Sequence, residues 1–413
     1  MTRMLASVTG SEEAEIALGA GADLIDLKDP SRGALGAQPV SVVRDTVAAV
    51  AGRRPVSAVT GDLPMQPATV LAAATAMAET GVDYVKVGIF PGGDAAACIR
   101  ALAPLASRVR LVVVQFADRT PDPSLLTVAA EAGFAGAMLD TATKSSGRLL
   151  DHMELPALRR FVDSCTQHGL LSGLAGSLEA PDIPRLLLLR PGFLGFRRAL
   201  CGADGRAARI VPESVQQIRA LIPPEDITPA IEGVDYRVLS AHGYVPDPDA
   251  TSAATDLVFV HDLVLPVRIG AYTSERAAPQ RVRFDVDVMI MRSTRPAEDM
   301  RDIFSYDIIS DGIRLLIDAG HIALVETLAE QIAAMLLEHP RVVQVSVKLE
   351  KLDVGPRIVG VRIERGRSSA KAQPTQVLPF RAVGASVPVH LSRSAGEVAT
   401  QSVAGEGAGG RAE

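Results

Sequence analysis

The stretch YVKVGI at residues 84–89 is a short and nearly continuous apolar run that contains one lysine. Such a run is typical of a parallel β-strand covered on both faces, because neither face then needs polar side chains. Similar runs recur through the first half of the chain, at 4–8, 24–28, 55–59, 110–116, 136–141, 171–176 and 193–198.

Segments of helical period separate these runs, at 11–20, 41–50, 66–79, 95–106, 123–132, 154–168, 179–189 and 212–221. Several of them begin with Ser, Pro or an acidic residue and end at Gly. Eight strand–helix units in residues 1–222 predict a TIM (β/α)8 barrel of the α/β class. A doubly wound open sheet is the structural alternative, but it needs neither eight units nor a helix after the last strand.

A second pattern follows the barrel. Frequent prolines in residues 223–255 predict a linker. Residues 256–367 then give strands at 257–269 and 281–291, helices at 306–319 and 325–338, and strands at 342–349 and 359–365. This order predicts a smaller α+β domain, with an antiparallel sheet and helices on one face. Residues 368–413 contain few large apolar side chains, so a disordered tail is expected.

The overall composition excludes several classes of protein. The chain has 413 residues, with 42 Lys+Arg against 48 Asp+Glu, and no basic block interleaved with aromatic residues, which argues against nucleic-acid binding. It contains no long apolar run or signal-peptide pattern, so no membrane contact and a cytoplasmic location are expected. The three cysteines and seven histidines form no ligand-spaced pair. We therefore expect no metal and no cofactor.

Lysine is rare in this chain, because only six of the 42 basic residues are lysines. Arginine stays protonated and cannot act as an amine nucleophile, so a retained lysine indicates amine chemistry. The first 222 residues contain Lys28, Lys86 and Lys144, and each lies in or after an even-numbered predicted strand. Alternate strands of such a barrel contribute side chains to shared layers, which predicts one common site. Chance survival under codon bias is the alternative.

Clustered ammonium groups lower one another's pKa and supply a neutral amine near pH 7. That chemistry favours a Schiff-base nucleophile. Asp140, at the end of the sixth predicted strand, is interpreted as a partner for one ammonium or as a proton acceptor, with a structural ion pair as the alternative. Asp26 alternates with Lys28 on its strand, and the pattern leaves a structural role and a chemical role open for it.

Two loops are candidates for phosphate binding, because barrels of this type bind phosphate in the loops after strands 7 and 8. The first contains Gly173, Gly176 and Ser177, ahead of a helix expected near Glu179. The second offers Gly195 for close approach and Arg197 or Arg198 for charge, and Arg197 is the chosen candidate. The glycines could equally be turn formers. Neither loop matches a nucleotide fingerprint, so a small phosphorylated carbonyl compound is the expected substrate.

Four ordered motifs, LIDLKDPSRGALGA (24–37), DYVKVGIF (83–90), MLDTATK (138–144) and GLAGSL (173–178), carry a family resemblance. The region resembles (5-formylfuran-3-yl)methyl phosphate synthase, the TIM-barrel lyase of methanofuran and methylofuran biosynthesis. The resemblance implies condensation of two glyceraldehyde 3-phosphate molecules with loss of phosphate and water. It implies Lys28 as the Schiff-base lysine and Lys86 as the proton acceptor, with Asp140 and Lys144 assisting elimination and ring closure. A Schiff-base aldolase acting on another phosphosugar is the alternative.

The second domain resembles dihydroneopterin aldolase at four residues: Glu275 after the first strand, Tyr306 and Glu326 at the starts of the two helices, and Lys351. The resemblance implies a dihydropterin held by Glu326, and a Lys351–Tyr306 pair that moves protons while glycolaldehyde leaves. It also implies a homo-oligomeric ring with sites between subunits.

One departure from that family concerns the loop after Lys351, where Leu352 and Asp353 stand in place of the usual proline. We therefore expect a looser loop with a carboxylate near the amine. Glu326 could simply favour its helix dipole, and Lys351 could be a strand-end charge. A noncatalytic domain that serves only oligomerisation stays an alternative.

Overall fold

The computed structural model describes residues 2–143, 146–202, 205, 207–222, 254–272, 275, 278–292, 303–354 and 358–367. Most of the predicted linker at 223–255 and the whole predicted tail at 368–413 lie outside the described residues. Lys144 lies outside them too. The barrel and the C-terminal module, residues 254–367, are therefore described separately.

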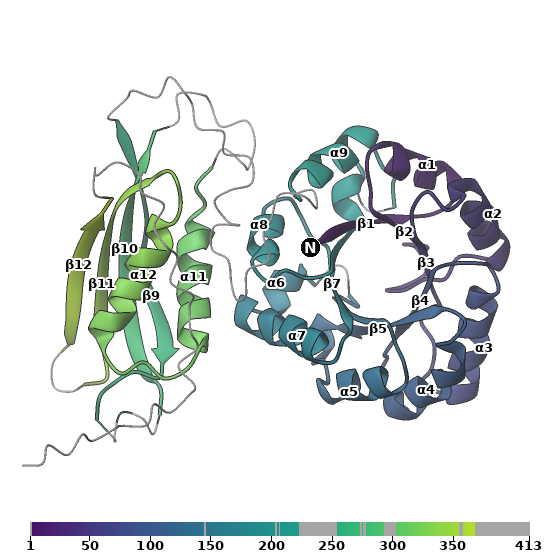
Figure 1. The fold of residues 1–413 in the computed structure, drawn as a ribbon, viewed down its shortest axis with the longest axis horizontal. Helices are drawn as coiled ribbons and strands as arrows, with labels where there is room; N and C mark the ends of the chain where they lie inside the picture. Colours follow the sequence, from purple (N-terminus) through teal and green to yellow (C-terminus); the bar gives the residue numbers. More distant parts are fainter. Residues whose placement is uncertain are drawn as a thin grey trace, which may run out of the picture. The chain divides into compact units, whose positions relative to one another are not determined.

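Eight parallel strands form a closed barrel, in which each strand pairs with the next and β8 pairs with β1 (Figure 1). This confirms the predicted TIM barrel and excludes the open sheet. The strands are β1 (Arg3–Val8), β2 (Leu24–Leu27), β3 (Val56–Val59), β4 (Tyr84–Gly88), β5 (Arg110–Phe116), β6 (Gly136–Asp140), β7 (Leu171–Leu174) and β8 (Phe193–Phe196).

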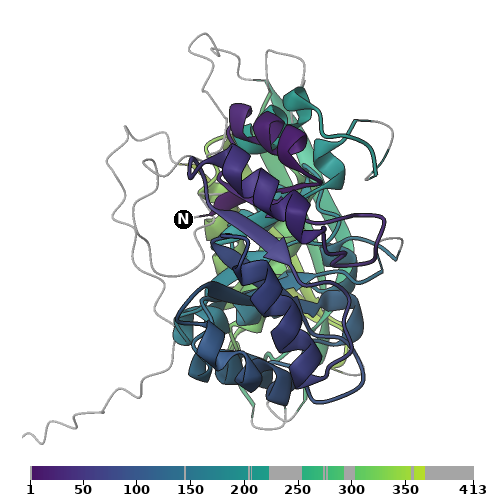
Figure 2. The same cartoon turned by 90° about the vertical axis from the view of Figure 1, so that its right-hand side faces the viewer.

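Helices surround the barrel, and those of residues 11–101 lie across its outer side in purple and blue (Figure 2). They are α1 (Ser11–Gly19), α2 (Val40–Val50), α3 (Pro67–Ala78), α4 (Ala95–Ala101), α5 (Ser124–Glu131), α6 (Leu149–His152), α7 (Leu155–Gln167), α8 (Asp182–Leu187) and α9 (Pro212–Ala220). The short α6 was not predicted. No helix in the described part of the chain is long and apolar enough to cross a membrane.

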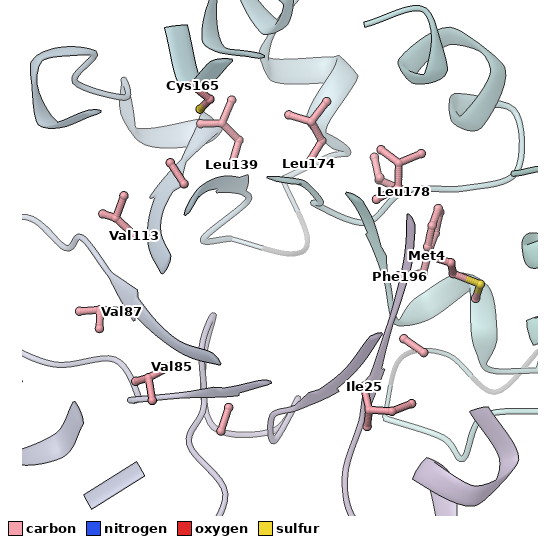
Figure 3. Close-up of a cluster of buried hydrophobic side chains, with 14 of the residues drawn as sticks. Met4, Ile25, Val85, Val87, Val113, Leu139, Cys165, Leu174, Leu178 and Phe196 are labelled. Carbon is pink, nitrogen blue, oxygen red and sulfur yellow. The ribbon is translucent and has the colours of Figure 1, made fainter. Parts of the chain in front are cut away.

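The strands are apolar on both faces because they pack in two directions. Side chains such as Met4, Ile25, Val85 and Leu139 point away from the barrel axis into the layer shared with the helices (Figure 3). A second cluster fills the barrel interior and includes Leu5, Val112 and Met138. Polar groups inside the barrel are therefore exceptions that need an explanation, because burying an unpaired polar group costs free energy.

The loop between β2 and α2 is fixed by a carboxylate from the next loop. Asp62 accepts hydrogen bonds from the backbone N–H groups of Ala34 and Leu35, at 3.0 and 2.8 Å. Leu35 is buried and packs in the interior cluster. These contacts hold the chain that follows Lys28 against the mouth of the barrel.

The C-terminal module is a four-stranded antiparallel sheet in the order β12-β11-β10-β9. Its elements are β9 (Thr255–Val267), β10 (Gln280–Met291), α11 (Tyr306–Asp318), α12 (Val325–Leu337), β11 (Val342–Lys351) and β12 (Val359–Gly366). The predicted alternation of β10 is confirmed, because Val282, Phe284, Val286 and Val288 are fully buried in one cluster with residues of both helices. The predicted α+β architecture is therefore confirmed.

Candidate active site

Lys28 and Asp140 meet at the C-terminal ends of β2 and β6. The Lys28 Nζ lies 3.7 Å from Asp140 Oδ2, and the two side chains are 9 % and 1 % exposed. The other Asp140 oxygen accepts a hydrogen bond of 2.7 Å from the N–H of Thr141. The backbone therefore fixes the orientation of the carboxylate that faces the Lys28 amine.

Lys86 and Asp26 form a second buried pair. The Lys86 Nζ lies 2.6 Å from Asp26 Oδ1, and the Ser57 hydroxyl donates to the same oxygen at 2.6 Å. Burial lowers the pKa of Lys86, the charge of Asp26 opposes this shift, and the charge of Lys28 reinforces it. The two lysines are thus close enough to influence each other electrostatically.

A cavity opens beside these residues and is lined by Ser7, Asp26, Lys28 and Asp140 together with the loops after β7 and β8. Lys86 is not among its lining residues, so it faces the cavity through its partner Asp26. The structure brings Lys28, Lys86 and Asp140 together as predicted. It also brings in Asp26, for which the sequence had left both roles open.

The predicted phosphate-binding residues divide into two groups. Gly176, Ser177, Gly195 and Arg197 line the cavity, whereas Gly173 does not. Gly173 lies within β7, and a Cβ there would come within 2.1 Å of the Phe193 ring. The assignment of Gly173 to the phosphate site is therefore corrected: the residue is a glycine because an aromatic ring packs on it.

Arg197 makes contacts that the sequence did not predict. Its terminal nitrogens donate to both carboxylate oxygens of Glu13, at 2.6 and 3.2 Å, and to the carbonyl groups of Ser7 and Ala208. The hydrogens of the two terminal nitrogens are thereby used, so Arg197, which also lines the cavity, holds the surrounding loops in place. Arg198 lines the same cavity and is exposed, which makes it the better cation for a phosphate.

The helix after β7 is shorter than predicted, because α8 begins at Asp182 and has six residues. The Asp182 carboxylate accepts from the N–H of Glu179 at 2.9 Å and pairs with Arg148 at 3.1 Å. A helix N-terminus near Glu179 is therefore wrong as an anion site. What remains for an anion is the loop at Gly176 and Ser177, whose φ angles of +121° and +50° lie in the left-handed region.

The C-terminal module joins two of its four predicted residues. The Lys351 amine donates to Glu275 Oε1 at 2.5 Å, and the backbone N–H of Tyr272 donates to Oε2 at 3.2 Å. These bonds lower the pKa of Glu275 to about 2, with Lys351 as the main cause. A Cβ on Gly270, whose φ is +140°, would come within 2.3 Å of the carboxylate. Glycine at 270 therefore makes room for the pair.

The other two predicted residues stand apart. Tyr306 is 63 % exposed and Glu326 is also exposed, and within the described residues neither side chain forms a hydrogen bond or ion pair with Glu275 or Lys351. Asp353 does not approach the Lys351 amine as expected. It accepts 2.7 Å hydrogen bonds from the backbone and the side chain of Arg281 instead, which ties the loop to β10.

No group of His, Cys, Asp and Glu side chains in the described ranges is placed to hold a metal ion. The observed features are a closed (β/α)8 barrel, a cavity at the C-terminal ends of its strands, and buried lysine–carboxylate pairs beside that cavity. In this fold that end of the strands carries the reacting groups. The barrel therefore belongs to the TIM-barrel proteins with a lysine-based site.

Comparison with known proteins narrows this class. The family model described as 4-HFC-P synthase matches residues 4–219, and the chain belongs to that family. A protein of Methylorubrum extorquens named putative (5-formylfuran-3-yl)methyl phosphate synthase is 47 % identical over 223 residues, covering 53 % of this chain and 92 % of its own. A synthase of the same name from Methanosarcina acetivorans is 36 % identical, covering 53 % of this chain and 98 % of its own.

The C-terminal module matches the dihydroneopterin aldolase model over residues 258–364. A solved structure of Escherichia coli dihydroneopterin aldolase in complex with neopterin is 33 % identical and covers 27 % of this chain and 99 % of its own, with a TM-score of 0.25. Both family resemblances inferred from the sequence motifs are thereby confirmed.

Proposed function

We propose that the barrel condenses two molecules of glyceraldehyde 3-phosphate into (5-formylfuran-3-yl)methyl phosphate through a Schiff base on Lys28. The observation that carries this proposal is the pair of buried lysines, each beside a carboxylate, at one cavity. The names of the curated relatives supply the product.

In the proposed reaction the Lys28 amine attacks the carbonyl carbon of the first triose, and the carbonyl oxygen leaves as water. The resulting iminium makes the neighbouring C–H acidic. A base takes that proton, and the enamine carbon bonds to the aldehyde carbon of the second triose. Lys86 receives the proton by way of Asp26, which contacts both the Lys86 amine and the cavity. Burial lowers the pKa of Lys86, which increases the fraction of neutral amine that can accept the proton.

Asp140 and Lys144 are proposed to assist the later elimination of phosphate and closure of the ring. Asp140 faces the Lys28 amine. It can therefore donate a proton to a leaving group on the substrate that is bound to Lys28. The loop at Gly176 and Ser177, with Gly195 and Arg198, is proposed to hold the phosphate. These groups lie on the β7 and β8 side, where barrels of this type bind phosphate.

Borohydride reduction in the presence of glyceraldehyde 3-phosphate tests the proposal. We expect a covalent adduct on Lys28, identified by peptide mass, and a furan aldehyde phosphate among the unreduced products. Lys28→Arg keeps the charge but removes the nucleophile, so it should abolish trapping and lower kcat by roughly 10³-fold or more. Lys348→Arg, on the partly exposed face of β11, is the matched control and should leave both unchanged.

A label found on Lys86 or Lys144 alone would contradict the assignment of the nucleophile. Trapping on Lys28 together with a product that contains no furan would support the alternative, a Schiff-base aldolase that acts on another phosphosugar.

We further propose that the C-terminal module binds a dihydropterin in a site completed by a second copy of the chain. The specific observation is that Glu275 and Lys351 are paired while Tyr306 and Glu326 are exposed elsewhere. Incubation of the full chain with dihydroneopterin should release glycolaldehyde, and Lys351→Ala should abolish the release while leaving the barrel reaction unchanged. Absence of both product and dihydropterin binding would leave only the role in oligomerisation.

A further inference from the structure

Ser7 is a buried hydroxyl that the proposed mechanism does not use. It lies near the end of β1, is 1 % exposed and lines the cavity, yet its Oγ has no hydrogen-bond partner among the residues that the structure describes. Buried side-chain oxygens in native proteins are nearly always hydrogen-bonded, so an exception at a cavity points to a ligand.

The neighbour of Ser7 has the same property. Ser7 pairs in register with Asp26, and Asp26 pairs with Ser57, so the three side chains form one row across β1, β2 and β3. Asp26 Oδ1 is bound by Ser57 and Lys86, whereas Oδ2 has no hydrogen-bond partner in the described part of the chain. Ser7 Oγ and Asp26 Oδ2 therefore belong to paired positions of β1 and β2 at the wall of the cavity, and neither oxygen has a hydrogen-bond partner among the described residues.

This pair fits a group that both donates and accepts a hydrogen bond. The carboxylate oxygen can only accept, and the serine hydroxyl has a proton to donate. A phosphate would be repelled by the carboxylate, and a carbonyl oxygen has no hydrogen to give to it. A hydroxyl group satisfies both oxygens at once.

The position of the pair identifies which hydroxyl it would take. Around the closed barrel β8 neighbours β1, and β1 neighbours β2. The cavity therefore presents Arg198 after β8, then Ser7 on β1, then Asp26 and Lys28 on β2 and just after it. A triose phosphate carries its phosphate, hydroxyl and carbonyl on successive carbons in the same order.

We infer that Ser7 and Asp26 bind the C2 hydroxyl of the triose whose carbonyl reacts with Lys28. This inference rests on the proposed function, and it makes Ser7 a residue that selects substrates by their hydroxyl. Ser7 donates to the hydroxyl oxygen, and the hydroxyl hydrogen is donated to Asp26 Oδ2. A substrate without that hydroxyl leaves both protein oxygens buried and unpaired, which disfavours its binding.

Binding of two unreactive probes tests the inference without relying on turnover. Glycerol 3-phosphate carries the hydroxyl, whereas 3-hydroxypropyl phosphate lacks it, and neither has a carbonyl for Lys28. Calorimetry on the full chain should show that the wild type prefers glycerol 3-phosphate by about tenfold, as expected for a hydrogen bond to a charged group. Ser7→Ala should reduce this preference to about twofold.

Ser172→Ala is the matched control, because Ser172 is a buried strand serine outside the cavity whose hydroxyl accepts from the N–H of Gly192 at 3.1 Å. It should keep the wild-type preference and lower the melting temperature. Ser7→Ala removes a hydroxyl that has no partner among the described residues, so the melting temperature of the variant should be equal to or above that of the wild type.

The outcomes separate the inference from the proposed function. An unchanged preference in Ser7→Ala, or no preference in the wild type, would overturn the hydroxyl site and leave a solvent molecule as the partner of the two oxygens. A tenfold preference that Ser7→Ala removes, in a protein that makes no furan product, would support the hydroxyl site and contradict only the proposed reaction.

Discussion

Asp26 organises the site at the scale of single residues. Its two carboxylate oxygens have different surroundings. Oδ1 contacts the Lys86 amine and the Ser57 hydroxyl, whereas Oδ2 is left for the cavity that Asp26 lines. A carboxylate inside a barrel is costly unless charge and hydrogen bonds compensate for the lost water. The Lys86 amine provides most of that compensation, so each residue of the pair accounts for the presence of the other.

Replacing this carboxylate should therefore destabilise the barrel. Asp26→Asn leaves Lys86 buried without a counter-charge, which should lower the free energy of unfolding by about 3 kcal/mol at pH 7. Losing the Asp26 charge also lowers the pKa of Lys86 further, so the variant should lose less stability at pH 10, where the amine is neutral. Amide exchange in β2 and β4 at the two pH values measures the difference.

Glu15→Gln provides the control, since Glu15 pairs with Arg53 and both side chains are about half exposed, at 50 % and 49 %. Exposed pairs contribute little to stability, so we expect no clear loss of stability in Glu15→Gln at either pH. An Asp26→Asn loss that is equal at pH 7 and pH 10 would show that Lys86 is already neutral in the native barrel.

Sequence reasoning reached Lys28, Lys86 and Asp140 because strand ends and even-numbered strands can be read from periodicity alone. The sequence did not show that Arg197 pairs with Glu13 while Arg198 stays exposed at the cavity. Which of two adjacent arginines turns toward Glu13 depends on the position of α1, a helix almost 200 residues away in the chain. Ser7 carried a weak signal, as the polar residue near the end of an otherwise apolar run.

At the scale of elements, the loop between β7 and α8 shows how backbone geometry prepares the site. Gly176 adopts a φ of +121°, and a Cβ there would lie 2.9 Å from Thr141 Cγ2, beside Asp140. The loop can therefore pack against the end of β6 only with glycine at this position. That contact places the β7 and β6 residues of the cavity at a fixed separation.

A methyl group at 176 should disturb binding more than stability. Gly176→Ala should raise KM for glyceraldehyde 3-phosphate by about tenfold, because the loop must move away from Thr141. Gly52→Ala has the same unfavourable sign of φ, at +71°, but no atom within 4 Å of the added Cβ, and it follows α2 far from the cavity. Both variants should lose about 1–2 kcal/mol of stability, but Gly52→Ala should keep the KM of the wild type.

Equal KM changes in the two variants would mean that backbone strain, and not the contact with Thr141, controls the loop. The sequence predicted a strand at 171–176, two residues longer than the observed β7, and it did not predict how the following helix begins. The apolar residues at 179–189 have helical spacing, yet the Asp182 carboxylate accepts from the N–H of Glu179 and starts the helix later. A competition between a side chain and the backbone at one turn cannot be read from periodicity.

At the scale of the whole molecule, the comparison with the curated relatives indicates which part of the chain forms the barrel site. The alignments cover 92 % and 98 % of the two relatives but only 53 % of this chain, so those relatives consist mainly of the barrel. We therefore expect a chain ending at Ile222 to fold and to retain the barrel reaction within about twofold in kcat. Its mass in solution should be that of a smaller assembly than the full chain.

Loss of the barrel reaction in this shortened chain, with its circular dichroism spectrum intact, would show that the C-terminal module contributes to the barrel site. The sequence pattern distinguishes the two modules, because the strand pattern changes from continuous apolar runs to the alternation of β10. It could not show whether one module needs the other.

The C-terminal module should lose stability in acid. Burial lowers the pKa of His339 from 6.5 to about 4, and the charges of Arg341 and Arg367 reinforce the shift. In the unfolded chain His339 binds a proton below pH 6.5, whereas in the folded module it binds one only below about pH 4. Stability is therefore complete above pH 6.5 and falls as the pH drops toward 4, by about 2–3 kcal/mol.

Amide exchange in α12 and β11 between pH 7.5 and pH 4 measures this loss. His339→Gln stays neutral throughout, so its exchange should show no such pH dependence above pH 4.5. Below that value Glu275 adds a second loss, because its folded pKa of about 2 lies under the ordinary 4.5 and its stabilisation disappears as the carboxylate is protonated. The same slope in His339→Gln as in the wild type would exclude the imidazole as the cause.

The hydrogen bonds between β1 and β8 also have a consequence for biosynthesis. Ser7 leaves the ribosome long before Arg198, yet both residues line one cavity. A nascent polypeptide that stops before Phe193 already contains Lys28, Lys86 and Asp140 but lacks β8, the last strand of the barrel. Reactivity toward a triose should therefore appear abruptly during translation, when β8 pairs with β1 and closes the barrel. The onset of this reactivity would report the time of barrel closure.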